Sequence, residues 1–89
     1  MHRYKLSKKL ERLFPKLCKK DKKLYEQILK KIDEIINCYD VESYKNLRYN
    51  LKDFKRVHIG HFVLVFSYDK TQDLILFEDF DNHDNIYKR

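Results

Sequence analysis

Four side chains in the C-terminal half of this 89-residue chain have the chemistry of an acid–base site: the imidazoles of His58, His61 and His83 and the guanidinium of Arg56. An imidazole titrates near about pH 6.5 and can accept or release a proton at neutral pH, and an arginine stabilises negative charge that develops on a phosphate. This combination suits metal-free RNA cleavage. One group takes the proton of a ribose 2′-OH, which attacks the adjacent phosphate, and a second group protonates the departing 5′ oxygen.

Three predicted strands bring these side chains to one end of a sheet. Apolar residues alternate with a period of two in residues 57–59, 62–68 and 74–80. The connections 60–61 and 69–73 are short enough for hairpins, so the strands should form an antiparallel meander. Its up-down-up course places the three histidines at the same end. Arg56 should share a face with His58, because side chains two residues apart in a strand point the same way.

Other interpretations of the same residues stay open. As metal ligands they would be His58 and His61 in an H-x-x-H spacing, His83, and Asp79 or Asp81. That spacing is short and nonspecific and no glutamate lies beside it as a base, so we expect no metal. Each histidine could also be a solvated residue at a sheet edge. Gly60 is the only glycine, which leaves no material for a phosphate-binding loop, and we expect no nucleotide or other cofactor.

Basic and aromatic residues are interleaved near the first strand and are candidates for binding RNA or the ribosome. The basic ones are Lys45, Arg48, Lys52, Lys55 and Arg56, and the aromatic ones are Tyr44, Tyr49, Phe54 and Tyr87. Aromatic side chains stack on bases, but in a protein of this size they also build the core. We assign Phe54 to the core and take Tyr49 and Tyr87 as the better stacking candidates.

A first helix is predicted to begin at Lys8. Ser7 is a good N-cap for it, and the apolar residues that follow, among them Leu10 and Phe14, recur at helical spacing. Pro15 lies inside this pattern and lacks the N–H that an interior helical position needs. We therefore expect a kink or a break near Phe14.

A second helix is predicted over residues 22–37, with Asp21 as its N-cap. The polar joint 19–21 makes the two helices an antiparallel hairpin. Residues 39–52 are expected to form a loop or irregular connection. The predicted fold class is α+β, with an N-terminal helical hairpin packed on an antiparallel meander, in a single domain over residues 1–89.

Charge is unevenly distributed. The chain has 20 Lys and Arg against 14 Asp and Glu, a formal charge of +6. Residues 1–38 carry 12 basic and 5 acidic side chains, residues 39–68 carry 5 and 3, and residues 69–89 carry 3 and 6. A polarised basic chain is a candidate for polyanion binding, although lysines on the wet faces of two helices give the same composition.

The expected location of the protein and the redox state of its cysteines are inferred from the lack of a membrane span, a secretory signal and typical cysteine spacings. Its longest apolar run, residues 62–66, is far shorter than the roughly 18 residues of a membrane span. The N-terminus has no apolar stretch typical of a secretory signal, so we expect a cytoplasmic protein with no membrane partner. Cys18 and Cys38 show no spacing typical of zinc or disulfide frameworks and are expected to be reduced.

An ordered set of motifs resembles the RelE/ParE superfamily of toxins. The set is Asn46-Leu47, residues 54–66, residues 74–80, and Asn82-His83-x-x-x-Tyr87, preceded by the two basic helices. The resemblance covers nearly the whole chain. It implies a RelE-like fold and a ribosome-dependent mRNA endonuclease that cuts message in the ribosomal A site. It also implies a tightly bound antitoxin, expected to be small, acidic and RelB-like.

Within the superfamily the chain is similar to the YafQ branch. Val63 and His83 stand where RelE proper has arginines and where the YafQ branch has an aliphatic residue and a histidine. The match is direct for His58 and His83 and approximate for His61, Lys45 and Tyr87. The resemblance therefore implies catalysis by His58 and His83, without assigning which is the base and which the acid.

Two functions are compatible with these residues. The first is a toxin endoribonuclease acting on translated mRNA, which the three converging histidines favour. The second is a ParE-like or catalytically silent basic binding module that inhibits a protein or ribosomal target by occupancy. The missing arginines favour this second function, since fewer fixed cations remain to stabilise a pentavalent phosphate. The helices of the antitoxin should lie along apolar grooves of this chain. The antitoxin would inhibit either by blocking entry into the ribosome or by displacing the C-terminal segment that carries His83 and Tyr87.

Overall fold

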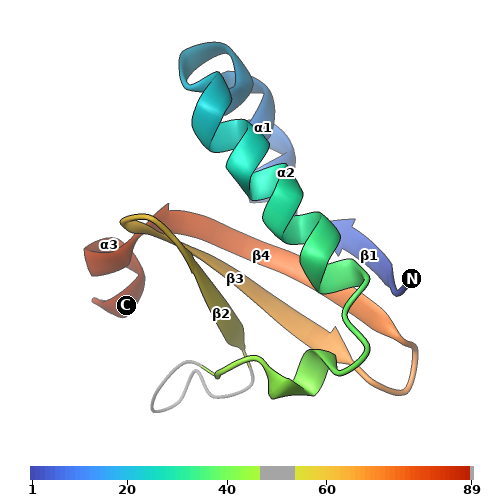
Figure 1. The fold of residues 1–89 in the computed structure, drawn as a ribbon. Helices are drawn as coiled ribbons and strands as arrows, with labels where there is room; N and C mark the ends of the chain where they lie inside the picture. Colours follow the sequence, from blue (N-terminus) through green and yellow to red (C-terminus); the bar gives the residue numbers. More distant parts are fainter. Residues whose placement is uncertain (47–53, 89) are drawn as a thin grey trace.

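The computed structural model describes residues 1–46 and 54–88, and it has two helices packed on a four-stranded sheet (Figure 1). In chain order the elements are β1 (Arg3–Leu6), α1 (Lys8–Lys20), α2 (Lys22–Ile36), the 3-10 turn η1 (Val41–Ser43), β2 (Lys55–Ile59), β3 (Phe62–Asp69), β4 (Leu74–Asn82) and α3 (His83–Tyr87). The predicted α+β class and helical hairpin are confirmed.

Both long helices begin at the predicted caps. The Ser7 hydroxyl accepts a hydrogen bond from the Leu10 N–H at 3.3 Å, and the Asp21 carboxylate accepts one from the Leu24 N–H at 3.2 Å. The joint between the two helices is Asp21 alone, because Lys19 and Lys20 belong to the last turn of α1. Their positive charges are favourable there, since the C-terminal end of a helix dipole is negative. No helix in the described ranges is long and apolar enough to cross a membrane.

Of the kink or break predicted near Phe14, the break is wrong, because α1 runs through Pro15 without interruption. Proline in a helix interior costs about 3 kcal/mol. The turn before it buries Leu10 and Phe14, which are 0% and 5% exposed. Burial of two such side chains contributes about 1.5–3 kcal/mol each, which is enough to offset the proline.

The sheet has the strand order β1-β4-β3-β2. The strands β2, β3 and β4 form the predicted antiparallel meander, and β1 pairs in parallel with β4, so the sheet is mixed rather than wholly antiparallel. This fourth strand was not predicted. It is a four-residue edge strand in which only Leu6 is withdrawn from solvent, so it has neither the length nor the apolar alternation of a sequence signal.

Both faces of the sheet carry buried side chains. The helices α1 and α2 cover one face, where Ile28 and Leu10 meet residues of β3 and β4 such as Phe66 and Phe77. On the opposite face a second cluster contains Val63, Val65, Ile86, Phe54 and Tyr87. The assignment of Phe54 to the core is thereby confirmed. The short α3, which supplies two members of this second cluster, was not predicted.

The predicted irregular connection over 39–52 contains η1, and its Val41 is only 2% exposed. Tyr44 packs edge-on against Phe66, with ring centroids 5.5 Å apart. Tyr44 is therefore a core contact rather than a free stacking platform. Residues 47–52 of this prediction lie outside the described residues.

Candidate active site at the end of the sheet

Local features of the chain bring His58 and His83 to the same end of the sheet. Between β2 and β3 the chain reverses at Gly60, whose φ of +61° is readily adopted only by glycine. At the end of β4 the Asn82 side-chain oxygen accepts a hydrogen bond from the α3 main chain at 2.9 Å, so His83 takes the first position of α3. The His83 N–H donates to the His61 carbonyl at 2.9 Å and ties α3 to the turn.

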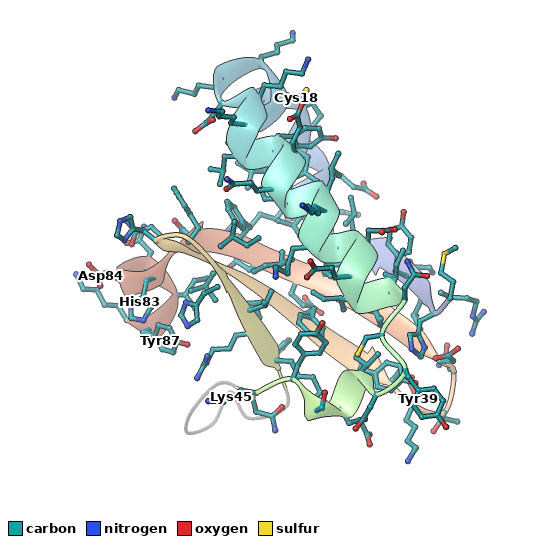
Figure 2. All side chains as sticks on the ribbon, in the orientation of Figure 1. Cys18, Tyr39, Lys45, His83, Asp84 and Tyr87 are labelled. Carbon is teal, nitrogen blue, oxygen red and sulfur yellow. The ribbon has the colours of Figure 1, made fainter. Side chains whose placement is uncertain are left out.

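Four side chains form one contiguous group, which we call the histidine cluster: Arg56, His58, His83 and Tyr87. The His58 and His83 rings are stacked with centroids 5.6 Å apart, and the His83 and Tyr87 centroids are 4.5 Å apart. Figure 2 shows His83 and Tyr87 projecting from α3. The predicted convergence of His58, His83 and Arg56 is thus present in the structure.

Arg56 orients His58. Its Nη1 lies 3.3 Å from His58 Nε2, and because a guanidinium has no acceptor, Nε2 must accept. In this contact His58 is neutral and carries its hydrogen on Nδ1. Partial burial lowers the pKa of His58 below its usual value, and the charges of Arg56 and His83 lower it further.

Arg56 also links the cluster to α3. Its guanidinium carbon lies 5.9 Å from the centre of the Tyr87 ring, within range of a cation–π contact. The Nε atom is buried and has no acceptor in the part of the chain that the structure describes. The guanidinium therefore retains hydrogen-bonding capacity that the described residues do not use.

Of the acidic residues near this end of the sheet, Asp84 contacts the histidine cluster. Asp84 Oδ1 lies 3.6 Å from His83 Nδ1 and forms an ion pair with it when the imidazole is protonated. Asp79 Oδ1 lies 2.8 Å from Lys9 Nζ, and Asp81 accepts a hydrogen bond from a side-chain amide of α3 at 3.1 Å. Within residues 1–46 and 54–88, no three His, Cys, Asp or Glu side chains are grouped as metal ligands.

Two predicted site residues, His61 and Lys45, contact members of the histidine cluster through their main-chain carbonyls. His61 contributes the main-chain carbonyl that receives the His83 N–H, and its side chain is exposed at the turn. Lys45 lies beside the start of β2, where its carbonyl accepts the Arg56 N–H at 2.9 Å. Its side chain is exposed.

Lys55 differs from the expectation of an RNA-binding cation. Its Nζ lies 3.1 Å from the Glu42 carbonyl, 3.2 Å from the Tyr44 carbonyl and 3.1 Å from Asn46 Oδ1. An ammonium group has three N–H donors, and these three oxygens account for all of them. The predicted binding residues Arg48, Tyr49 and Lys52 lie outside the described residues.

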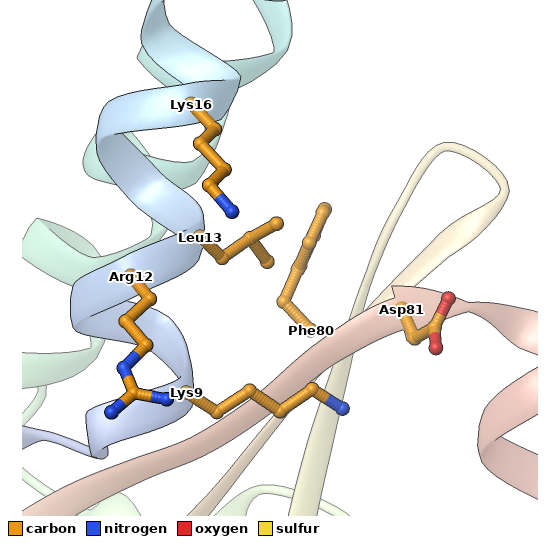
Figure 3. A pocket seen from close by; sticks show the side chains of 6 residues that line it. All are labelled: Lys9, Arg12, Leu13, Lys16, Phe80 and Asp81. Carbon is orange, nitrogen blue, oxygen red and sulfur yellow. The ribbon is translucent and has the colours of Figure 1, made fainter.

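A groove of about 480 Å³ lies next to the site, between α1 and the end of β4 (Figure 3). Leu13 and Phe80 form its apolar lining, and its polar lining is Lys9, Arg12, Lys16 and Asp81. Lys9 is paired with Asp79. Arg12 and Lys16 have no ion-pair partner in the described chain, so the groove combines an apolar strip with two available cations.

A second basic surface, which we call the basic tip, is the joint of α1 and α2. It consists of the exposed residues Lys19, Lys20, Lys22 and Lys23, and Figure 1 shows this joint at the end of the hairpin remote from the sheet. The first turn of α2 contains no acidic residue. Lysines there oppose the positive end of the helix dipole, which is a local cost of some tenths of a kcal/mol each.

Some residues of the site were missed in the sequence. Ile86 is 3% exposed and anchors α3, but a five-residue helix has no periodic signal. Asp84 directly follows His83, and the Asn82 cap before it is a recognisable helix-start signal. The spacing of Arg12 and Lys16 on α1 is also visible in the sequence, since residues four apart share a helix face.

Comparisons with known proteins identify relatives of similar sequence. No protein-family model matches the chain. A protein of Methanocaldococcus jannaschii named "Putative toxin RelE4" is 48% identical over 90 residues, covering 100% of this chain and 94% of that protein. An uncharacterized protein of Methanosarcina mazei is 47% identical over 88 residues, covering 98% of this chain and 100% of that protein.

A solved structure shares the architecture. One chain in the crystal structure of the toxin–antitoxin complex RelBE2 from Mycobacterium tuberculosis matches with a TM-score of 0.60. The match covers 91% of this chain and 96% of that chain at 16% sequence identity. At this identity the likeness concerns the fold.

Proposed function

This chain belongs to the RelE family of toxins, and we propose that it is a ribosome-dependent endoribonuclease that cleaves mRNA by acid–base catalysis. The observation that carries the proposal is the stacking of His58 and His83, with centroids 5.6 Å apart, beside the Arg56 guanidinium. At this separation one phosphodiester can contact both imidazoles. Two proton-transfer groups and one cation are what transesterification by a ribose 2′-OH requires.

In the proposed reaction the 2′-OH replaces Arg56 Nη1 as the hydrogen-bond donor to His58 Nε2, and the guanidinium turns to the phosphate. His58 then removes the proton from the 2′-OH, and the resulting oxygen attacks the adjacent phosphorus. The bond from phosphorus to the 5′ oxygen breaks, and His83 gives its proton to that oxygen. The products are a 2′,3′-cyclic phosphate and a free 5′-OH, with one proton gained by His58 and one lost by His83. Arg56 stabilises the charge that develops on the phosphate.

The surroundings of the two imidazoles support this choice of base and acid. A general base must be neutral, and the pKa of His58 is lowered by partial burial and by the charges of Arg56 and His83. The acid must carry a proton, and Asp84 lies 3.6 Å from His83 Nδ1, where it can pair with the imidazolium. Tyr87, in contact with His83, is proposed to stack on a base next to the cleaved bond.

The test is to induce the gene and map new 5′ ends on cellular mRNA, with the wild type and with His58→Ala and His83→Ala. Each replacement should lower cleavage by about two to four orders of magnitude, the usual effect of a general acid or base. Both side chains are exposed, so the fold should survive. Folded variants that both cleave within a few-fold of the wild type would refute the assignment.

The alternative function is a non-catalytic binding module of the same fold. The observation that favours it is Val63, which pairs with His58 in the sheet and is fully buried where RelE proper has a cation. Such a module would arrest translation or another target by occupancy alone. Growth arrest with no new mRNA 5′ ends, unchanged in the two histidine variants, would select this alternative.

We propose that the basic tip docks on ribosomal RNA. Two of its lysines, Lys22 and Lys23, oppose the helix dipole of α2, and a locally unfavourable choice of residue at an exposed site favours a binding role over a stabilising one. Phosphate contacts release counterions, so ribosome binding should weaken steeply with salt. Ribosomes are in the cytoplasm, so we propose that this protein acts there. Its membership of the YafQ branch stays a prediction.

We further propose a small, acidic antitoxin as the partner that neutralises this chain. The groove along α1 fits an amphipathic acidic segment, with an apolar side chain against Leu13 and Phe80 and carboxylates against Arg12 and Lys16. Charge reversal of Arg12 and Lys16 together should weaken binding of the antitoxin at least tenfold. Unchanged affinity in the folded double variant would place the antitoxin elsewhere.

A further inference from the structure

The three hydrogen bonds of Lys55 hold the segment 42–46 against the first residue of β2. Nζ donates to the carbonyls of Glu42 and Tyr44 and to Asn46 Oδ1, at 3.1, 3.2 and 3.1 Å. We propose that Lys55 is a positioning residue, which places Lys45 on the face of the sheet that carries the histidine cluster. This inference rests on the proposed function, because it assigns Lys45 to the RNA-cleaving site.

Strand register gives the position of Lys45. Asn46 pairs with Lys55 in an antiparallel bridge, and the Arg56 N–H donates to the Lys45 carbonyl at 2.9 Å. Lys45 is therefore directly opposite Arg56. Residues directly opposite in an antiparallel pair have their side chains on the same face. Since Arg56 contacts His58, Lys45 belongs to the face of these two residues.

The same register explains why a second contact is needed. β2 is at the edge of the sheet, and the segment 44–46 joins it through a single bridge. A slip of one residue in such a pairing turns each side chain to the opposite face. Lys55 and Asn46 are joined on the face away from Arg56, and the two carbonyl contacts fix the segment that leads to them. Lys55 thus acts on the cluster through Lys45 rather than by touching substrate.

Hydrogen exchange tests the positioning without a ribosome. In Lys55→Met the stem is kept and the donors are lost, so the Arg56 amide should exchange at least tenfold faster, while amides between β3 and β4 keep their protection. Lys55→Arg, which retains donors, should restore most of the protection. Lys70→Met is the matched control, because Lys70 contacts the same segment only through the Glu42 carboxylate, at 3.8 Å.

Cleavage assays test whether Lys55 acts through Lys45. Lys45→Met and Lys55→Met should each lower mRNA cleavage about tenfold, and the double variant should be no slower than the slower single variant. Effects that multiply in the double variant would overturn the proposal, because Lys55 would then act independently. If Lys55→Met does not fold, Asn46→Ala removes one acceptor and should give a smaller increase in Arg56 exchange.

The positioning role of Lys55 and the proposed function can be refuted separately. Unchanged Arg56 exchange in folded Lys55→Met overturns the positioning role whether or not the wild type cleaves RNA. A wild-type protein that leaves mRNA intact overturns the proposed function and the assignment of Lys45 to that reaction. The exchange experiment then still decides whether Lys55 fixes the register.

Discussion

Replacing Arg56 by glutamine should move the pH dependence of cleavage to higher pH. Arg56 Nη1 lies 3.3 Å from His58 Nε2, so the charge of the guanidinium favours the neutral form of the imidazole. Partial burial, Arg56 and His83 together lower the pKa of His58. A base works when deprotonated, so cleavage should rise with pH through this lowered pKa. In Arg56→Gln, which keeps a side-chain donor without its charge, the same rise should begin at higher pH.

The size of the shift follows from the distance. Two unit charges 3.3 Å apart repel by about 1.3 kcal/mol in water. One pKa unit corresponds to about 1.4 kcal/mol. Because His58 is exposed and salt screens the pair, the repulsion that is lost in Arg56→Gln is smaller than this, and we expect the pKa of His58 to rise. The plateau rate should also fall, since the cation that stabilises the phosphate is lost.

Two measurements check this. NMR titration of the His58 ring in the free protein gives its pKa directly, and cleavage of mRNA on programmed ribosomes at a series of pH values gives the kinetic pKa. Arg3→Gln is the matched control, because Arg3 is on β1 and its guanidinium binds the Gln72 carbonyl at the opposite end of the sheet. It should leave the pKa of His58 unchanged.

The reasoning fails if the pKa of His58 stays the same or falls in Arg56→Gln. It also fails if the ring titrates higher but the acidic limb of the rate profile does not move, because His58 would then not be the base. A shift of the alkaline limb instead would point to His58 as the acid.

Three further outcomes are expected. The Asp73 and Cys38 contacts raise the pKa of His2, so its stabilising effect should be complete below about pH 6.5 and lost as pH rises through the folded-state value. Urea unfolding of wild type and His2→Gln should therefore converge at high pH. Ser7→Ala removes the cap of α1 and a bond to β4, and calorimetry should show a loss of about 1–2 kcal/mol. Charge reversal of Lys22 and Lys23 should stabilise α2 yet lower ribosome affinity and its salt dependence, and unchanged affinity would exclude the basic tip.

The meander and helices could be predicted because their signals are local. Alternation of apolar residues identifies β3, and Ser7 and Asp21 are strong caps, so the starts of α1 and α2 were confirmed. The prediction that α1 could break near Phe14 was wrong, because core packing outweighs the local preference of Pro15. β1 was missed because its stability comes from pairing with β4, which is distant in sequence and leaves little pattern in four residues.

The site was predictable to the level that topology allows. Strand direction places His58 and His83 at one end, and the two-residue spacing places Arg56 with His58. The hydrogen-bond partners of individual side chains could not be predicted in this way. The sequence shows Lys55 only as one more cation in a basic stretch, and its three acceptors come from a segment nine to thirteen residues away. His61 was assigned a side-chain role, whereas its contact with the cluster is through its carbonyl.

The order of the histidine cluster depends on α3, a helix of only five residues. A helix of five residues is not stable alone, so α3 keeps its place through the Asn82 cap, the His83 N–H bond and the burial of Ile86. Those contacts are few compared with the core beneath α1 and α2. Because local opening requires only the contacts of one element to break, α3 can leave the sheet while the core stays folded. His83 and Tyr87 would leave with it, so the geometry needed for catalysis can be lost at a free energy well below that of unfolding.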